Sequence, residues 1–327
     1  MEYINFGSTG LKVSRLALGL GLRGQDDETV AQRMIEHTLD VGINLIDCAN
    51  VYGAMDDRAN VGQSERVLGR VLQGRRDRVV VTSKVTSPMG HGPNDWGASR
   101  THIMHQLEQS LRRLNTDYID VYLIHFHDDT TPAEELVRTL DDIVRAGKVR
   151  YIGCCNHQAW QVCRALWYAD RVHAEPYMCV QNQYNLLHRG LEDEMFGLIR
   201  ETGLGAMAYS PLAVSLLTGI YAPDEPPPAN SFWGRPNNRL VFEKMMAGQI
   251  GQVVATLHEV ASDLDKTPAQ VAIAWVLSHP EITCAIVGCD TPEQMDDNIG
   301  ALGWTLAPEH RQRLDEVSKP PTNGYRG

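Results

Sequence analysis

Short apolar runs alternate with amphipathic segments along most of the chain. The runs are rich in Val, Ile and Leu, which is typical of strands buried on both faces of a parallel sheet. Between them, apolar residues recur at three- and four-residue steps, which predicts helices. The predicted strands are residues 15–20, 43–47, 79–85, 118–125, 150–155, 177–182, 205–209 and 283–287. Eight strands alternating with helices favour a (β/α)8 TIM barrel, an α/β fold, over an open doubly wound sheet.

Two segments fall outside this alternation. Residues 3–14 predict a short N-terminal β-hairpin, which would plug the bottom of the barrel. Residues 211–239, which include PDEPPP and NSFWGRPNNR, predict a long irregular loop after the seventh strand. A loop of that length inside a compact domain is usually functional. We also expect extra helices after strands 7 and 8, and no linker divides the chain, so residues 1–327 are expected to form a single domain.

Composition narrows the class of protein. The 327 residues are 43% hydrophobic, which is ample for a core, and the formal net charge of −11 argues against a nucleic-acid partner. The longest apolar stretch, residues 271–277, is too short to span a membrane, and the N-terminus lacks the pattern of a secretion signal. The seven cysteines contain no CxxC pair, so we expect no disulfide framework, no metal site and a cytoplasmic location.

Four ionisable residues lie at or just beyond the ends of three consecutive predicted strands. Asp47 and Tyr52 follow INLI, Lys84 follows VVVTS, and His125 ends YIDVYLIH. In a parallel barrel the carboxyl ends of the strands converge on one rim, where active sites are built. Residues nearly eighty positions apart could therefore share one pocket. As a set, they can move a proton.

Each of these residues has an ordinary structural interpretation. A tyrosine after a strand usually packs, and an aspartate there usually caps a turn or helix. Lys84 could be a solvated rim lysine, and His125 a rim histidine with its hydrogen bonds satisfied. Their joint occurrence in this register favours a catalytic role over four separate structural ones.

Seven segments, in order from end to end, resemble the aldo-keto reductases. They are GINLIDCANVYG, VVVTSKV, YIDVYLIH, VRYIGCCN, VQNQYN, AYSPL and AIVGCDTPEQMDDNIGAL. The GASRTHI and DNIGAL segments are most similar to the branch that contains potassium-channel β-subunits and bacterial relatives. The resemblance implies an NAD(P)H-dependent oxidoreductase that interconverts a carbonyl (aldehyde or ketone) and an alcohol.

The resemblance also implies a role for each of the four residues. Tyr52 would be the general acid that protonates the carbonyl oxygen. A free phenol has a pKa of about 10, and the Lys84 ammonium would lower the pKa of Tyr52 toward working pH. Asp47 would hold Lys84 in place and keep it charged. His125 would hydrogen-bond the substrate oxygen and orient it, while the cofactor carries the hydride.

The family pattern further implies a groove for the dinucleotide. Asn156 and Gln181 would bind the nicotinamide carboxamide, and Tyr209 would stack on the nicotinamide face. Ser210, Leu212 and nearby backbone amides would cover the pyrophosphate. The full set of implied cofactor-binding residues is Asp47, Cys155, Asn156, Gln181, Tyr209, Ser210, Pro211, Leu212, Arg235, Gly288, Asp290, Gln294, Asp297 and Asn298.

The chain departs from the family pattern at three positions. Cys155 stands where Ser is common, and a thiol is the weaker hydrogen-bond donor. Asp290 stands where Ser, Thr or Arg often lies near the 2′-phosphate, and Ile220 stands where Lys is common. Arg235 and Arg239 could supply the cations that a 2′-phosphate needs. The resemblance favours NADP(H) as cofactor, with NAD(H) as the alternative.

Other functions stay open at this point. A regulatory subunit could hold the cofactor with little turnover, as the channel-subunit resemblance suggests, although His125 argues against it. A barrel lyase could use Lys84 to form a Schiff base, which requires a neutral lysine. The expected partner is a small carbonyl or alcohol. Loop aromatics such as Trp96, Phe232 and Trp233 suit a bulky substrate, but a sugar, a polycyclic ketone and a simple aldehyde all stay possible, as does any oligomeric state.

Overall fold

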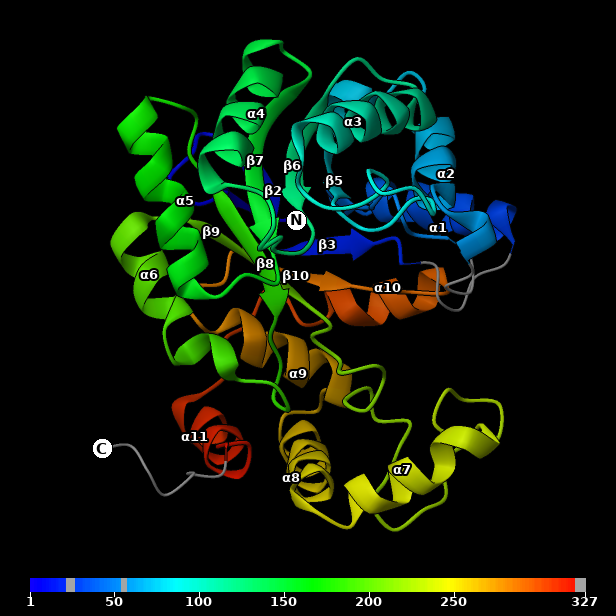
Figure 1. Ribbon diagram of the computed structural model, residues 1–327. Coiled ribbons are helices and arrows are strands. Elements are labelled where there is room, and N and C mark those ends of the chain that lie inside the picture. Colours follow the sequence, from blue (N-terminus) through cyan, green and yellow to red (C-terminus); the bar gives the residue numbers. More distant parts are fainter. Residues whose placement is uncertain (22–26, 54–57, 321–327) are drawn as a thin grey trace.

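The computed structural model describes residues 1–21, 27–53 and 58–320. Its centre is a closed barrel of eight parallel strands in chain order, completed by pairing of the last strand with the first (Figure 1). The strands are β3 (Leu16–Gly19), β4 (Leu45–Asp47), β5 (Val80–Val85), β6 (Ile119–Ile124), β7 (Val149–Cys155), β8 (Cys179–Gln183), β9 (Gly205–Tyr209) and β10 (Cys284–Val287). The predicted TIM barrel is confirmed, with each strand within a few residues of its expected position.

Helices surround the barrel (Figure 1). They are α1 (Glu28–Asp40), α2 (Gln63–Val71), α3 (Arg100–Leu114), α4 (Ala133–Arg145), α5 (Ala159–Val172), α6 (Met195–Thr202), α9 (Pro268–Leu277) and α10 (Pro292–Ile299). In the described ranges, no helix combines the length and the apolar character needed to cross a bilayer.

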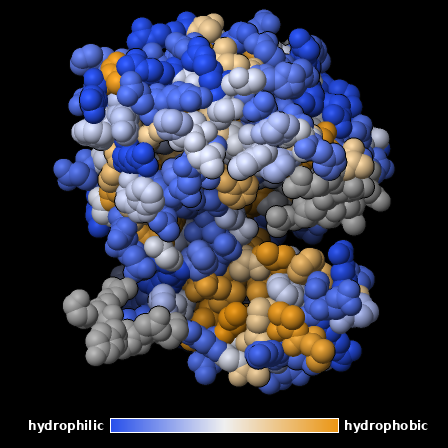
Figure 2. Space-filling model, in the orientation of Figure 1, coloured by the Kyte–Doolittle hydropathy of each residue, from blue (hydrophilic) through white to orange (hydrophobic). Residues whose placement is uncertain are grey.

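The expected extra helices are present. Two of them, α7 (Pro236–Met246) and α8 (Gln249–Asp263), follow β9, and α11 (Pro308–Val317) ends the fold. The segment predicted to be irregular as far as residue 239 is therefore helical from Pro236 onward. Pro236 is the first residue of α7, a position that proline favours because its backbone angle is already helical. Figure 2 shows hydrophobic side chains gathered where α7 and α8 lie, and Leu240 of α7 is 76% exposed.

The barrel interior is apolar at its lower end and polar at the rim. Side chains alternate across a strand, so Val80, Thr82 and Lys84 of β5 share one face. Val80 packs in an apolar cluster with Leu45 of β4, among other residues. Thr82 and Lys84, further along β5, instead form hydrogen bonds with a carboxylate of β4. The same alternation that fills the core therefore delivers polar groups to the rim.

The N-terminal hairpin closes the lower end of the barrel. Strands β1 (Tyr3–Asn5) and β2 (Lys12–Ser14) pair antiparallel, and Phe6 in their turn is completely buried in the interior cluster. Gly205, the first residue of β9, makes this packing possible. A Cβ atom there would lie 2.4 Å from the Phe6 ring.

Shortening Phe6 should leave a cavity under the barrel. We expect Phe6→Ala to lower the free energy of unfolding by about 3–5 kcal/mol, measured by chemical denaturation. Phe232→Ala is the matched control, because Phe232 is 43% exposed and should cost much less. Equal losses in the two variants would contradict a packed plug.

Candidate active site

The four residues singled out from the sequence meet at the rim of the barrel. Asp47 is the last residue of β4, Lys84 lies near the end of β5, and His125 directly follows β6. The Lys84 Nζ atom lies 2.6 Å from Asp47 Oδ2 and 4.6 Å from the centre of the Tyr52 ring. The rings of Tyr52 and His125 are 5.7 Å apart, nearly edge to face. The structure thus places an acid, a cation, a carboxylate and an imidazole in one cluster.

The Lys84–Asp47 ion pair is buried, and both side chains make further hydrogen bonds. Lys84 is completely buried and also donates to the Cys48 carbonyl oxygen at 2.9 Å. Asp47 Oδ1 accepts from Thr82 Oγ1 at 2.5 Å. Burial of Lys84 opposes its charge, but the adjacent Asp47 carboxylate more than offsets this and the pKa of Lys84 is raised. Lys84 is therefore a permanent cation at neutral pH.

Tyr52 differs from the sequence-based expectation in one respect. Burial raises the pKa of its phenol, and the nearby Lys84 ammonium, which lowers it, only partly compensates. The pKa of Tyr52 therefore lies above its ordinary value instead of being moved toward neutrality. The phenol keeps its proton at neutral pH, as a proton donor must.

His125 is neutral. Burial, and then the charge of Lys84, lower the pKa of His125 to about 3. A neutral imidazole has one N–H donor and one bare nitrogen acceptor. Its Nδ1 lies 3.0 Å from Ser87 Oγ, and its ring stacks on Phe126 with centres 4.5 Å apart. His125 can thus offer one hydrogen bond to a carbonyl oxygen without carrying charge.

Asn156 and Tyr209 are tied to the same cluster. Asn156 has a left-handed backbone with φ of 56°, which asparagine tolerates better than most residues. Its Nδ2 donates to the His125 carbonyl oxygen at 3.0 Å, and its Oδ1 accepts from the Tyr209 hydroxyl at 2.8 Å. The ends of β6, β7 and β9 are therefore linked by one amide side chain.

Gln181 connects the cluster to Asp47. Its Nε2 donates to Asp47 Oδ1 at 2.8 Å, and its Oε1 lies 3.6 Å from the thiol of Cys155. The sequence predicted Gln181 only as a contact to the nicotinamide. In the structure its amide also helps to hold the carboxylate that pairs with Lys84.

A second group lies at the end of β10. Gly288 is exposed and begins the turn. The backbone N–H of Asp290 donates to Gln294 Oε1 at 2.8 Å. Asn298 Nδ2 lies 3.2 Å from the Cys289 sulfur. Gly288 and Asp290 lie in the β10–α10 turn and Gln294 and Asn298 on α10, and Thr291 is the N-cap of that helix.

Asp297 has a structural role that the sequence did not reveal. Its carboxylate accepts from Thr267 Oγ1 at 3.1 Å and from Gln270 Nε2 at 2.9 Å. Thr267 is the N-cap of α9, so Asp297 joins α10 to the start of α9. The Asp297 carboxylate, which the sequence assigned to adenosine binding, is thus at least partly engaged in hydrogen bonds within the protein.

The remaining predicted cofactor residues lie in the segment that follows β9. Ser210 has a left-handed backbone with φ of 52°, and its carbonyl accepts from Asn185 Nδ2 at 2.8 Å. Pro211 and Leu212 follow directly. Arg235 is exposed and precedes α7, while Arg239 pairs with Glu243 one turn along that helix, at 3.0 Å.

Two polar contacts of the site were not predicted. Thr82 lies two residues before Lys84 on the same strand face and opposite Asp47 in the β4–β5 register, so strand alternation could have found it. Ser87 lies beyond the end of β5, where the local sequence carries no such signal.

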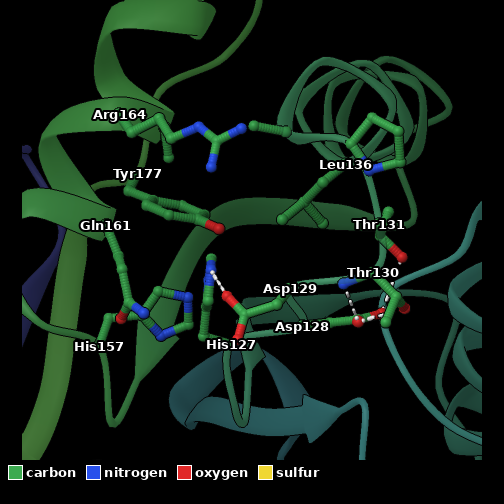
Figure 3. Close-up of a pocket in the computed structure, with 13 residues that line it drawn as sticks. His127, Asp128, Asp129, Thr130, Thr131, Leu136, His157, Gln161, Arg164 and Tyr177 are labelled. Carbon is green, nitrogen blue, oxygen red and sulfur yellow. Dashed lines mark hydrogen bonds and ion pairs between the residues drawn. The ribbon is translucent and has the colours of Figure 1, made fainter.

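A separate cavity of about 170 Å³ lies beside the rim (Figure 3). His127 and His157, which line it, follow His125 and Asn156 closely in the chain, and Arg164 and Tyr177 complete its far wall. His127 Nε2 lies 3.1 Å from Asp129 Oδ1. None of the four clustered residues lines this cavity, so it is distinct from the candidate active site. Among the described residues, no group of His, Cys, Asp and Glu could hold a metal ion.

Comparisons with known proteins agree with this arrangement. Residues 15–319 match the family model described as "Aldo/keto reductase family". The chain is 36% identical to "Uncharacterized oxidoreductase YrpG" of Bacillus subtilis (strain 168), over 98% of this chain and 97% of that protein. It is 36% identical to a "Probable voltage-gated potassium channel subunit beta" of Oryza sativa subsp. japonica, over the full length of both. A protein of the same description from Arabidopsis thaliana is 34% identical over 98% of each chain. The chain belongs to the aldo/keto reductase family, whose chemistry is nicotinamide-dependent oxidoreduction.

Proposed function

We propose that this protein interconverts a carbonyl compound and an alcohol, with Tyr52 as the general acid and base. The observation that carries the proposal is the buried Lys84–Asp47 pair, 2.6 Å apart, with Lys84 Nζ 4.6 Å from the Tyr52 ring. A buried cation beside a phenol stabilises the phenolate that forms as the proton leaves. A purely structural role for Tyr52 needs no such cation.

The residues divide the work. Tyr52 gives its proton to the carbonyl oxygen, and the Lys84 ammonium stabilises the resulting phenolate. Asp47, held by Thr82 and Gln181, keeps Lys84 charged and in place. His125 donates an N–H to the same oxygen and orients the substrate. A bound nicotinamide dinucleotide supplies or accepts the hydride.

The rim fits a nicotinamide group. Asn156 directly follows β7, Gln181 lies on β8 and Tyr209 ends β9, and together they provide two amides and an aromatic face next to the catalytic cluster. Amides suit a carboxamide, and a tyrosine ring suits a flat heterocycle. We assign the nicotinamide to these residues. We assign the adenosine to Gly288 of the β10–α10 turn and to Gln294 and Asn298 of α10.

Cofactor preference is tested at Asp290. We retain NADP(H) as the cofactor on the family resemblance, and keep NAD(H) as the alternative because a carboxylate at position 290 would repel a 2′-phosphate. Asp290→Arg should raise affinity for NADPH relative to NADH by about tenfold, equivalent to about 1.4 kcal/mol, in fluorescence titrations. Asp296→Arg, which makes the same charge change within helix α10, is the control. An unchanged ratio in Asp290→Arg would remove this contact.

Turnover is tested directly with purified protein. We expect NADPH or NADH absorbance to decay faster with at least one aldehyde or ketone of a chemically diverse panel than without substrate. Tyr52→Phe should return the decay to the substrate-free rate. Binding of dinucleotide without any substrate-dependent decay across the panel would contradict the proposal.

A cofactor-binding regulatory subunit is the second candidate. Two relatives carry the description "Probable voltage-gated potassium channel subunit beta", which supports this reading. The complete set of Asp47, Tyr52, Lys84 and neutral His125 favours the enzyme, since a cofactor sensor without turnover has no need of a proton donor. A Schiff-base lyase is less well supported, because it requires a neutral lysine, whereas Asp47 raises the pKa of Lys84 and keeps it protonated.

A further inference from the structure

Ser87 is buried against the catalytic histidine. Its Oγ lies 3.0 Å from His125 Nδ1, and the two residues are only 4% and 7% exposed. Ser87 lies just beyond β5, two residues after Val85, the last residue of that strand. In a neutral imidazole, the hydrogen bond made by one nitrogen decides which nitrogen carries the proton. Ser87 is therefore placed to set the tautomer of His125.

The direction of this hydrogen bond follows from what else surrounds Ser87. Within the described part of the chain, Ser87 Oγ has no hydrogen-bond partner other than His125. If Nδ1 carried the proton and donated to Oγ, the serine hydroxyl hydrogen would be buried without an acceptor, which is unfavourable. If the hydroxyl instead donates to an unprotonated Nδ1, its hydrogen is satisfied and only the lone pairs of Ser87 Oγ lack a donor. The second arrangement puts the proton on Nε2.

A strained residue fixes this contact. Thr86 has φ of 98°, a conformation that a β-branched side chain rarely adopts. Its Oγ1 accepts from the Phe126 N–H at 3.0 Å, and its carbonyl accepts from the Gly97 N–H at 3.0 Å. The first contact ties the segment after β5 to the residue that follows His125, and the second ties it to Gly97. Strain of this kind persists where surrounding contacts enforce it, often at functional sites.

We propose that Ser87 is a positioning residue, whose hydroxyl donates to Nδ1 of His125 and so holds the Nε2–H tautomer that a carbonyl oxygen requires. A carbonyl oxygen can only accept, so the other tautomer would face it with a bare nitrogen. This inference rests on the proposed function. The lowered pKa of His125 is consistent with it, since an imidazolium would carry protons on both nitrogens.

The tautomer can be read without any turnover. In protein labelled with ¹⁵N-histidine, long-range ¹H–¹⁵N correlation spectra at neutral pH distinguish a protonated from a bare ring nitrogen. His125→Asn identifies the His125 signals. We expect Nε2 protonated and Nδ1 bare but hydrogen-bonded in the wild-type protein. A protonated Nδ1 would overturn the proposal, whether or not the protein reduces carbonyls.

Variants separate positioning from general packing. Ser87→Ala should move the Nδ1 resonance to that of a nitrogen without a hydrogen bond, and should lower kcat about tenfold while the dinucleotide Kd is unchanged. Ser87→Thr, which keeps the hydroxyl, should retain the wild-type resonance. Ser83→Ala is the matched control, because it removes a buried hydroxyl of β5 that bonds Glu65 instead, at 2.5 Å. An unchanged Nδ1 resonance in Ser87→Ala, or an equal change in Ser83→Ala, would refute the assignment.

Discussion

Replacing Tyr52 with phenylalanine should lower kcat for carbonyl reduction by about 10²–10⁴-fold, the usual contribution of a general acid. The dinucleotide Kd should stay nearly the same, because only the transferable proton is lost and the ring keeps its place beside Lys84 and His125. Steady-state kinetics with the best substrate of the panel and a fluorescence titration of the cofactor measure the two quantities.

Tyr221→Phe is the matched control for this prediction. Tyr221 is 2% exposed, and its hydroxyl has no hydrogen-bond partner among the residues that the structure describes. The same chemical change there should leave kcat within about twofold of wild type, because ordinary substitutions away from a site have small effects. Near wild-type kcat in Tyr52→Phe would show that another group supplies the proton.

Removing the Lys84 ammonium should affect stability as well as activity. Lys84→Met leaves the Asp47 carboxylate buried without its cation, and breaking a buried ion pair in this way costs about 3–5 kcal/mol of unfolding free energy. Turnover should be lost too, since nothing then stabilises the phenolate of Tyr52. Chemical denaturation and the carbonyl-reduction assay measure the two effects.

Two further variants separate the causes. The double variant Asp47→Asn with Lys84→Met should recover part of the lost stability, because no charge is then left unpaired, but none of the activity. Arg138→Met, which breaks the exposed pair with Glu134 on α4, should cost less than about 1 kcal/mol. If Lys84→Met is as mild as Arg138→Met, the buried pair is not holding the site together.

The strand pattern predicted the barrel and the gathering of its rim residues. The apolar runs predicted each strand within a few residues, and the convergence of parallel strand ends predicted that Asp47, Lys84 and His125 lie together. This succeeded because period and strand direction are properties of local sequence. The N-terminal hairpin could likewise be predicted, because its two strands and their turn lie within one short segment.

Contacts between side chains from elements far apart in the chain could not be predicted from the sequence. The hydrogen bond from Gln181 to Asp47 joins residues 134 positions apart, and the hydrogen bond from Thr267 to Asp297 joins residues 30 positions apart. The direction of the Tyr52 pKa shift depends on how deeply the ring is buried, and the neighbouring residues in the sequence do not specify that burial. The start of α7 at Pro236 was not predicted, because the local sequence is rich in Pro and Asn, residues that usually indicate a loop.

A single-turnover experiment tests the proton-transfer role of Tyr52 most directly. Protein loaded with one equivalent of reduced dinucleotide is mixed rapidly with excess carbonyl substrate, in H₂O and in D₂O, and the decay of the reduced cofactor is followed. We predict slower decay in D₂O for the wild-type protein and decay slower by about 10²-fold or more for Tyr52→Phe. Equal decay rates for the two proteins, with no solvent isotope effect in either, would contradict the role assigned to Tyr52.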